Sequence, residues 1–144
     1  MTADADRAAT LVRALQAGTT NDRDALGTLC TQDVKVWTPA FNASSLSEVL
    51  TEFQRRDDAF SSVALEVRPL DVGGEYACAE WTVTMTHSGD LSLGDREVVE
   101  PTGLPITLNG VTVAEFRGDQ ICSVRQYWDE LTVFEQLGLL HDES

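Results

Sequence analysis

His87 and Gln126 each lie on an apolar face of an expected strand. The side chain of one can transfer a proton, and that of the other can form hydrogen bonds. An imidazole titrates near pH ~6.5, so His87 could give or take a proton near neutrality. An amide is not a base, but a buried Gln126 must pair with a substrate carbonyl or with another side chain. A structural role is open for both, and the His87 ring would then order the turn at Ser88 and Gly89.

Aromatic and apolar residues share the strand faces of these two positions. Trp81 and Met85 alternate with His87 on one expected strand, so the three side chains share a face. Trp128 has the parity of Gln126 on another strand. Aromatic rings bury large areas and stack on planar ligands, although they also build ordinary cores. The candidate walls of a substrate pocket are Trp37, Phe41, Phe53, Trp81, Met85, Val124 and Trp128.

Other kinds of chemistry are not indicated by the residue spacing. Cys30, Cys78 and Cys122 lie singly in apolar runs, which favours small buried hydrophobes in a reducing compartment. Metal-ligand spacing, a phosphate-binding glycine loop, a nucleophile elbow and a dinucleotide fingerprint are all missing from the sequence. We therefore expect neither a metal nor a cofactor. Asp129 offers a carboxylate, but its position before the apolar run that starts after Glu130 favours a helix N-cap.

Length and charge narrow the class of protein. The chain has 144 residues, of which 42% are hydrophobic, as expected for one domain over residues 1–144. Its net charge of −14 argues against nucleic acid and anionic membranes as partners, because both repel an acidic surface. No apolar run approaches the ~20 residues of a membrane-spanning helix. The acidic start at Met1–Asp6 differs from a secretory signal, so we expect a cytoplasmic protein.

Apolar residues at helical spacing predict three helices before residue 60 and one after residue 129. The first helix is expected to end at Gly18, which offers a left-handed cap. The second begins after Thr20 or Asn21 as its N-cap. The third opens with a capping box at Ser45–Glu48.

Alternation with a period of two predicts strands over residues 34–37, 64–70, 76–87, 106–116 and 121–128. In the strand at 76–87 the odd positions are apolar and the even ones mostly polar, as in a sheet packed on one side. The order of elements indicates an α+β fold, a cone-shaped curved antiparallel sheet covered by the N-terminal helices. A strongly bent sheet leaves a pocket between itself and its helices, where ligands bind.

Three segments of the chain, in this order and spacing, resemble the SnoaL-like polyketide cyclases of the nuclear-transport-factor-2-like superfold. The segments are Trp81–Asp90, which reads W-x-x-x-x-T-H-x-G-D, then Pro101–Gly103 with Gly110–Phe116, and finally Ile121–Leu139. The resemblance implies the cone-shaped fold and points Thr112 into the pocket as a further candidate for substrate binding. It also implies an acid/base Asp on the last strand, at the position that Gln126 occupies here.

The resemblance implies a cofactor-free cyclase or isomerase of secondary metabolism that acts on an apolar, carbonyl-bearing substrate of polyketide or terpenoid type. Gln126 would polarise the carbonyl and His87 would move a proton. A small-molecule-binding module without chemistry is the alternative that the missing Asp favours. An epoxide-hydrolase-like enzyme is a third possibility, but it needs a carboxylate to activate water, and none is apparent in the sequence.

Two further expectations follow from the resemblance. The superfold implies a homodimer through the outer face of the sheet, and the threonines at even positions of 76–87 are compatible with that. The polar loop from Gly89 to Pro101 is longer than in typical relatives. It is interpreted either as a lid over the pocket or as a surface excursion.

Overall fold

The fold is seen in a computed structural model that describes residues 3–70, 72–93 and 97–139. Its elements follow one another as α1 (Ala3–Thr20), α2 (Arg23–Leu29), β1 (Cys30–Trp37), β2 (Asn42–Ala43), α3 (Leu46–Ala59), β3 (Phe60–Leu70), β4 (Tyr76–His87), β5 (Leu91–Leu93), β6 (Glu97–Val99), β7 (Pro105–Arg117), β8 (Gln120–Trp128) and α4 (Glu130–Gln136). Within these described ranges, no helix has the length and apolar character needed to cross a membrane.

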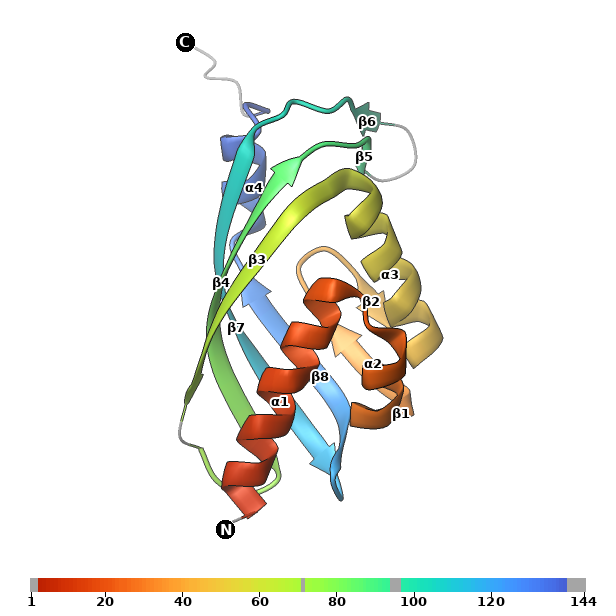
Figure 1. Ribbon diagram of the computed structural model, residues 1–144, viewed down its shortest axis with the longest axis vertical. Helices are drawn as coiled ribbons and strands as arrows, with labels where there is room; N and C mark the ends of the chain where they lie inside the picture. The colour runs from red at the N-terminus through yellow and green to blue at the C-terminus, as the bar shows by residue number, and fades with distance from the viewer. Residues whose placement is uncertain (1–2, 71, 94–96, 140–144) are drawn as a thin grey trace.

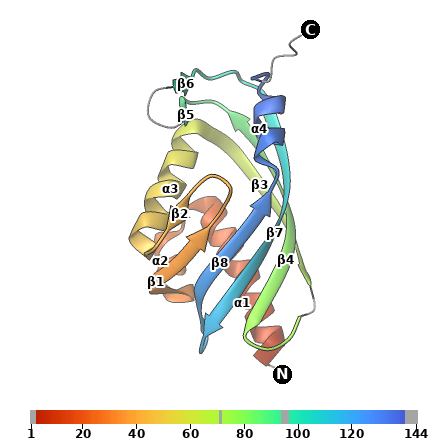
Figure 2. The same cartoon turned by 180° about the vertical axis from the view of Figure 1, so that it is seen from behind.

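The main sheet has six strands in the order β2-β1-β8-β7-β4-β3, and β5 pairs with β6 in a separate sheet of two strands. Figure 1 shows the six-stranded sheet curving around α1, with α2 and α3 on the same side. In Figure 2 the same arrangement is seen from behind, with β1 and β8 in front of the helices. The predicted α+β fold, a curved sheet covered by the N-terminal helices, is therefore confirmed.

One strand pairing differs from the predicted antiparallel sheet. β1 runs parallel to β8, with Val36 opposite Val124. The other neighbouring strands of the described sheet are antiparallel, so the sheet is mixed. A parallel pair joins segments that are distant in the chain. The local alternation that predicts each strand carries no information about such a partner.

The helix ends follow local sequence signals with two differences from prediction. The capping box at Ser45–Glu48 opens α3, where the Ser45 hydroxyl accepts a 3.2 Å hydrogen bond from the backbone N–H three residues on. Gly18 does not end α1, which continues to Thr20 before Asn21 adopts a left-handed φ of 52°. Asp22 rather than its two predecessors caps α2. Asn tolerates the left-handed region better than most residues, so Gly18 is not needed there.

The helices bury the concave face of the sheet. The odd-numbered residues of β4 are buried or partly buried, as the alternation predicted. Helix α1 packs on β3 and β4, and α3 packs on β1. One apolar cluster includes Leu11 of α1 and Ile121 of β8, and a second includes Ile106 of β7 and Val133 of α4. Both clusters border the space described next.

Candidate functional site

A large cavity lies between the concave face of the sheet and the helices. Its volume is about 1240 Å³, which exceeds the ~300–1,000 Å³ of most pockets for small molecules. Side chains of α1 and α3 line one side, and side chains of β4, β7 and β8 line the other. Most of them are apolar, and they include Leu11, Leu15, Val49, Phe53, Met85 and Val124.

All but two of the residues predicted for the site line this cavity. Those that do are Phe41, Phe53, Trp81, Met85, Thr112, Val124, Gln126 and Trp128. Their contact with a substrate remains a prediction. The two exceptions are Trp37 and His87, and each lies elsewhere for a definite structural reason.

Trp37 lies on the outer face of the sheet. Val34 and Val36 of the same strand line the cavity, so strand alternation turns Trp37 away from it. Its side chain is 44% exposed, and its ring centroid lies 5.4 Å from that of Tyr127. The prediction that Trp37 forms a wall of the pocket is therefore wrong.

His87 ends β4 but does not line the cavity. Its Nδ1 accepts a 3.3 Å hydrogen bond from the backbone N–H of Thr102 and lies 3.0 Å from the hydroxyl of the same residue. The ring of Phe60 packs against the imidazole, which is 0% exposed. The expected projection of His87 into the cavity is wrong, because the segment before β7 covers the strand end and bonds to the ring. The alternative, a structural histidine, matches this placement.

A buried tryptophan is held in one orientation on the cavity face. Trp81 Nε1 donates a 2.9 Å hydrogen bond to Thr112 Oγ1, and both side chains are buried. The Trp81 ring occupies the place of a side chain at Gly110, where an added Cβ would lie 2.3 Å from Cζ2. The Trp128 ring meets it edge-on, with 6.1 Å between centroids. Together these contacts fix a rigid aromatic wall.

Gln126 presents an amide to the cavity. It lies on β8 directly opposite Thr112 of β7 and is partly buried. Within the described ranges no hydrogen bond joins its side chain to another residue, although the neighbouring Trp81 and Trp128 indoles are both paired. Its two N–H donors and its carbonyl oxygen are therefore open to a ligand.

The sequence matches the family model "SnoaL-like polyketide cyclase" over residues 9–137. The chain belongs to the SnoaL-like polyketide cyclase family. No curated protein matches the sequence.

Several solved structures of other proteins have the same fold as this chain. One is a proposed SnoaL-like polyketide cyclase from Jannaschia sp. CCS1, with 16% identity and a TM-score of 0.84 over 98% of this chain and 97% of that one. Another is AclR, a proposed hydroxylase from Streptomyces galilaeus, with 20% identity and a TM-score of 0.78 over 99% and 87%. A third, from Catenulispora acidiphila, has a ketosteroid isomerase-like fold, 19% identity and a TM-score of 0.71 over 91% and 93%.

Carboxylates do line the cavity of this SnoaL-like protein, contrary to the expectation from its sequence. They are Glu52, Asp58, Asp90 and Glu130. Glu52 is 3.3 Å from the guanidinium of Arg55, and Asp58 accepts from the side chain of Gln54. Glu130 is partly buried and pairs with a residue of the cavity wall, since Trp128 Nε1 donates to its Oε2 at 2.9 Å.

Sequence reasoning missed Glu130 because it resembles an ordinary first-turn acid of a helix. Asp129 is the N-cap of α4, as predicted, and its side chain accepts from the backbone N–H of Leu131 at 3.0 Å. The cap directs the chain out of β8 so that Glu130 lies beside the end of the strand. Glu130 accepts the hydrogen bond from Trp128 only because of this turn. The periodic pattern of apolar and polar residues in the sequence does not reveal such a contact.

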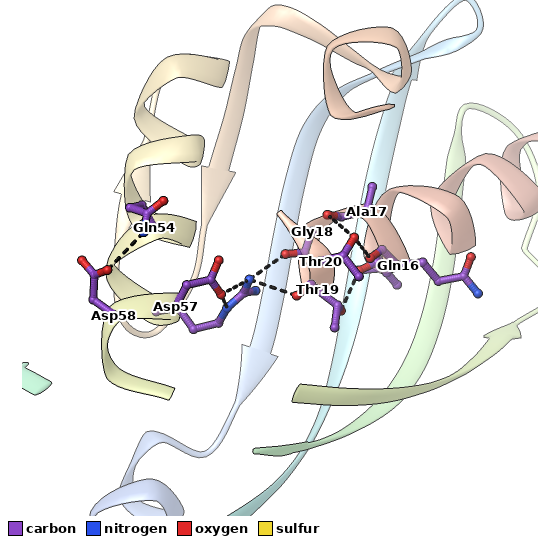
Figure 3. Close-up of polar contacts among 10 residues, drawn as sticks. Gln16, Ala17, Gly18, Thr19, Thr20, Gln54, Asp57 and Asp58 are labelled. Atoms are coloured by element: carbon purple, nitrogen blue, oxygen red, sulfur yellow. Dashed lines mark hydrogen bonds and ion pairs between the residues drawn. The ribbon is translucent and has the colours of Figure 1, made fainter. Parts of the chain in front are cut away.

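A polar seam joins the two helices that border the cavity. Arg56 Nη2 on α3 donates to the carbonyl oxygens of Gly18 at 2.8 Å and Thr19 at 3.2 Å, and it lies 2.9 Å from Asp57 Oδ1. Figure 3 shows these contacts running from the end of α1 to Asp57 on α3. The guanidinium also lies 5.2 Å from the ring centroid of Phe53. This seam ties α3 to the C-terminal carbonyls of α1.

Cys30 is the cysteine that borders the cavity. Burial raises the pKa of its thiol to about 11, so the thiol stays protonated at neutral pH and is a weak nucleophile. Cys30, Cys78 and Cys122 are all free thiols. In the described ranges, no group of three or more His, Cys, Asp or Glu residues is arranged to hold a metal ion.

Proposed function

We propose that this protein is a cofactor-free enzyme that closes a ring in, or isomerises, an apolar carbonyl compound of polyketide or terpenoid type. The observation that carries the proposal is the Gln126 amide, which has no partner among the described residues and lies on the wall of a mostly apolar cavity of about 1240 Å³. Family membership supports the same class of substrate.

The geometry supports polarisation of a substrate carbonyl. A ligand oxygen that accepts from the Gln126 amide would gain negative charge as the reaction proceeds, and a fixed donor in an apolar site stabilises such charge strongly. The Phe53 and Trp81 rings would hold a planar ligand against that donor. Folding a flexible substrate so that its reacting atoms meet lowers the entropic part of the barrier.

Binding is tested with 2-tetralone, a bicyclic apolar ketone, by quenching of tryptophan fluorescence. A Trp37→Phe background removes the tryptophan that lies outside the cavity. We expect saturable quenching, and we expect Gln126→Leu to weaken affinity by about tenfold through loss of one hydrogen bond. Quenching that does not saturate would contradict the proposal. An affinity for 2-tetralone that is the same in the wild type and in Gln126→Leu would contradict it as well.

Turnover separates an enzyme from the alternative, a binding module. The probe is 2,6-heptanedione, whose aldol ring closure gives a hydroxy ketone that loses water to form a conjugated cyclohexenone. The ultraviolet absorbance of that cyclohexenone reports the product. We expect the wild-type protein to accelerate ring closure above the rate in buffer. An inert wild type together with an active Gln126→Asp variant would identify the natural protein as a binder, because the substitution restores the acid/base carboxylate that the family resemblance implies.

We further propose a homodimer that forms through the outer face of the sheet. Trp37 and Tyr127 are 44% and 46% exposed there, and their rings contact each other. Large exposed aromatic groups are typical of protein interfaces. Sedimentation should show a dimer that Trp37→Ser with Tyr127→Ser dissociates, and a monomer at high concentration would contradict it.

The three free thiols favour a reducing compartment, in agreement with a cytoplasmic location.

A further inference from the structure

We infer that Glu130 is the acid/base residue of this site, supplying the carboxylate that β8 lacks at Gln126. The inference rests on the proposed function, since it assigns a residue to the proton transfer that ring closure or isomerisation requires. A carboxylate can accept and return a proton, which the Gln126 amide cannot do near neutral pH.

Glu130 is placed for this role by the end of β8. Gln126 and Trp128 alternate on the inner face of the strand, and both line the cavity. Asp129 then caps α4, and Glu130 as its first residue also lines the cavity. The amide and the carboxylate therefore line one cavity, from positions two residues before and two residues after Trp128 in the chain.

Trp128 orients the carboxylate. Its Nε1 donates to Glu130 Oε2 at 2.9 Å, and its ring is held in turn by the edge-on contact with Trp81. The second carboxylate oxygen, Oε1, has no hydrogen-bond partner among the described residues. A base that is held by one oxygen and free at the other is pre-positioned for proton transfer.

The other carboxylates of the cavity are less suited to this role. Glu52 lies 3.3 Å from the Arg55 guanidinium, so one of its oxygens is already paired within α3. Asp58 and Asp90 are exposed, so water solvates them. Glu130 alone among these four is both partly buried and hydrogen-bonded to an indole of the cavity wall.

The proposed step is balanced without any oxidant or reductant. Glu130 Oε1 takes a proton from the carbon next to the substrate carbonyl, and the C–H electron pair moves into an enolate whose oxygen accepts from Gln126. In an isomerisation the proton returns to another carbon of the enolate. In a ring closure the enolate carbon bonds to a second carbonyl carbon, and Glu130 returns the proton to the resulting alkoxide.

Hydrogen–deuterium exchange of 2-tetralone in D2O tests the assignment without needing the natural substrate. Mass spectrometry follows loss of the hydrogens next to the carbonyl, and fluorescence measures affinity in parallel. We expect wild-type protein to catalyse exchange. Glu130→Gln, which keeps an oxygen acceptor for Trp128, should lose about 100-fold to 10,000-fold of that rate with unchanged affinity. Glu135→Gln, on the exposed side of α4, should exchange at the wild-type rate.

The outcomes separate the failure of this assignment from the failure of the proposed function. Wild-type exchange that Glu130→Gln leaves intact overturns the role of Glu130 while the enzyme proposal stands. Binding of 2-tetralone without any exchange overturns both, because the protein then performs no proton chemistry on a bound ketone. Trp128→Phe, which removes the indole donor and keeps an aromatic ring, should lower the exchange rate by a smaller factor than Glu130→Gln.

Discussion

Trp81 Nε1 and Thr112 Oγ1 form a buried hydrogen bond of 2.9 Å that joins β4 to β7 on the wall of the cavity. Thr112 is fully buried, and Gln126 lies opposite it on β8. The bond also fixes one of the two indole rings of the cavity wall, so the shape of the cavity depends on this polar pair.

Thr112→Val should destabilise the protein by about 1–3 kcal/mol. The substitution keeps the shape of the side chain but leaves the Trp81 indole N–H buried without an acceptor. Chemical denaturation monitored by circular dichroism measures the change. Thr84→Val is the matched control, because Thr84 is exposed on the outer face, and it should change stability by less than about 0.5 kcal/mol. Equal effects of the two substitutions would contradict a stabilising role for the buried bond.

Gly110→Ala should destabilise the protein by about 1–3 kcal/mol, since the new methyl group overlaps the Trp81 ring. It should also weaken binding of 2-tetralone, because the displaced ring enters the cavity. Gly27→Ala is the control, and it should stabilise the protein rather than destabilise it. The site in α2 is open, and alanine is the better helix former by about 1 kcal/mol. A neutral Gly110→Ala would show that the ring is not held against the backbone.

His87→Leu should lower stability by about 1 kcal/mol, because the backbone N–H of Thr102 loses the acceptor of a partly buried hydrogen bond. The affinity of the folded variant for 2-tetralone should not change, since His87 lies outside the cavity. Denaturation and fluorescence titration measure the two effects separately. Loss of turnover with full stability would instead support the catalytic role predicted from the sequence.

Cys30 should react slowly with a thiol reagent in the folded protein at pH 8. Burial raises the pKa of this thiol from 9.0 to about 11, and the thiolate is the reactive form. A Cys78→Ser, Cys122→Ser variant isolates the signal of Cys30. Because its pKa is raised on folding, the associated stability is complete below about pH 9 and is lost as pH rises through about 11. Rapid labelling at pH 8 without unfolding would contradict the burial of the thiol.

Local sequence patterns predicted the wall of the cavity but not its ends. Alternation along β4 and β8 identifies Trp81, Met85 and Gln126 as inward-facing, because the side-chain period of a strand is fixed. The same rule turns Trp37 outward, because Val34 and Val36 face the cavity and Trp37 shares the parity of the exposed Lys35. The charged side chain of Lys35 was the signal in the sequence that marks this outer face.

The errors at the ends of strands have a common physical cause. His87 shares the parity of Trp81, yet Thr102 of the following loop bonds to its ring and excludes it from the cavity. Glu130 lies beyond the end of β8, where strand parity no longer applies, and it faces the cavity only because Asp129 turns the chain into α4. Contacts made by loops and turns depend on tertiary geometry and are not encoded in a local period.

The infrared spectrum of bound 2-tetralone labelled with carbon-13 at its carbonyl tests the central claim most directly. A hydrogen bond from the Gln126 amide weakens the carbonyl bond, so the stretching frequency of the bound ketone should be lower in the wild-type protein than in Gln126→Leu. A bound ketone with the same frequency in both proteins would contradict the claim that Gln126 polarises a carbonyl inside this cavity.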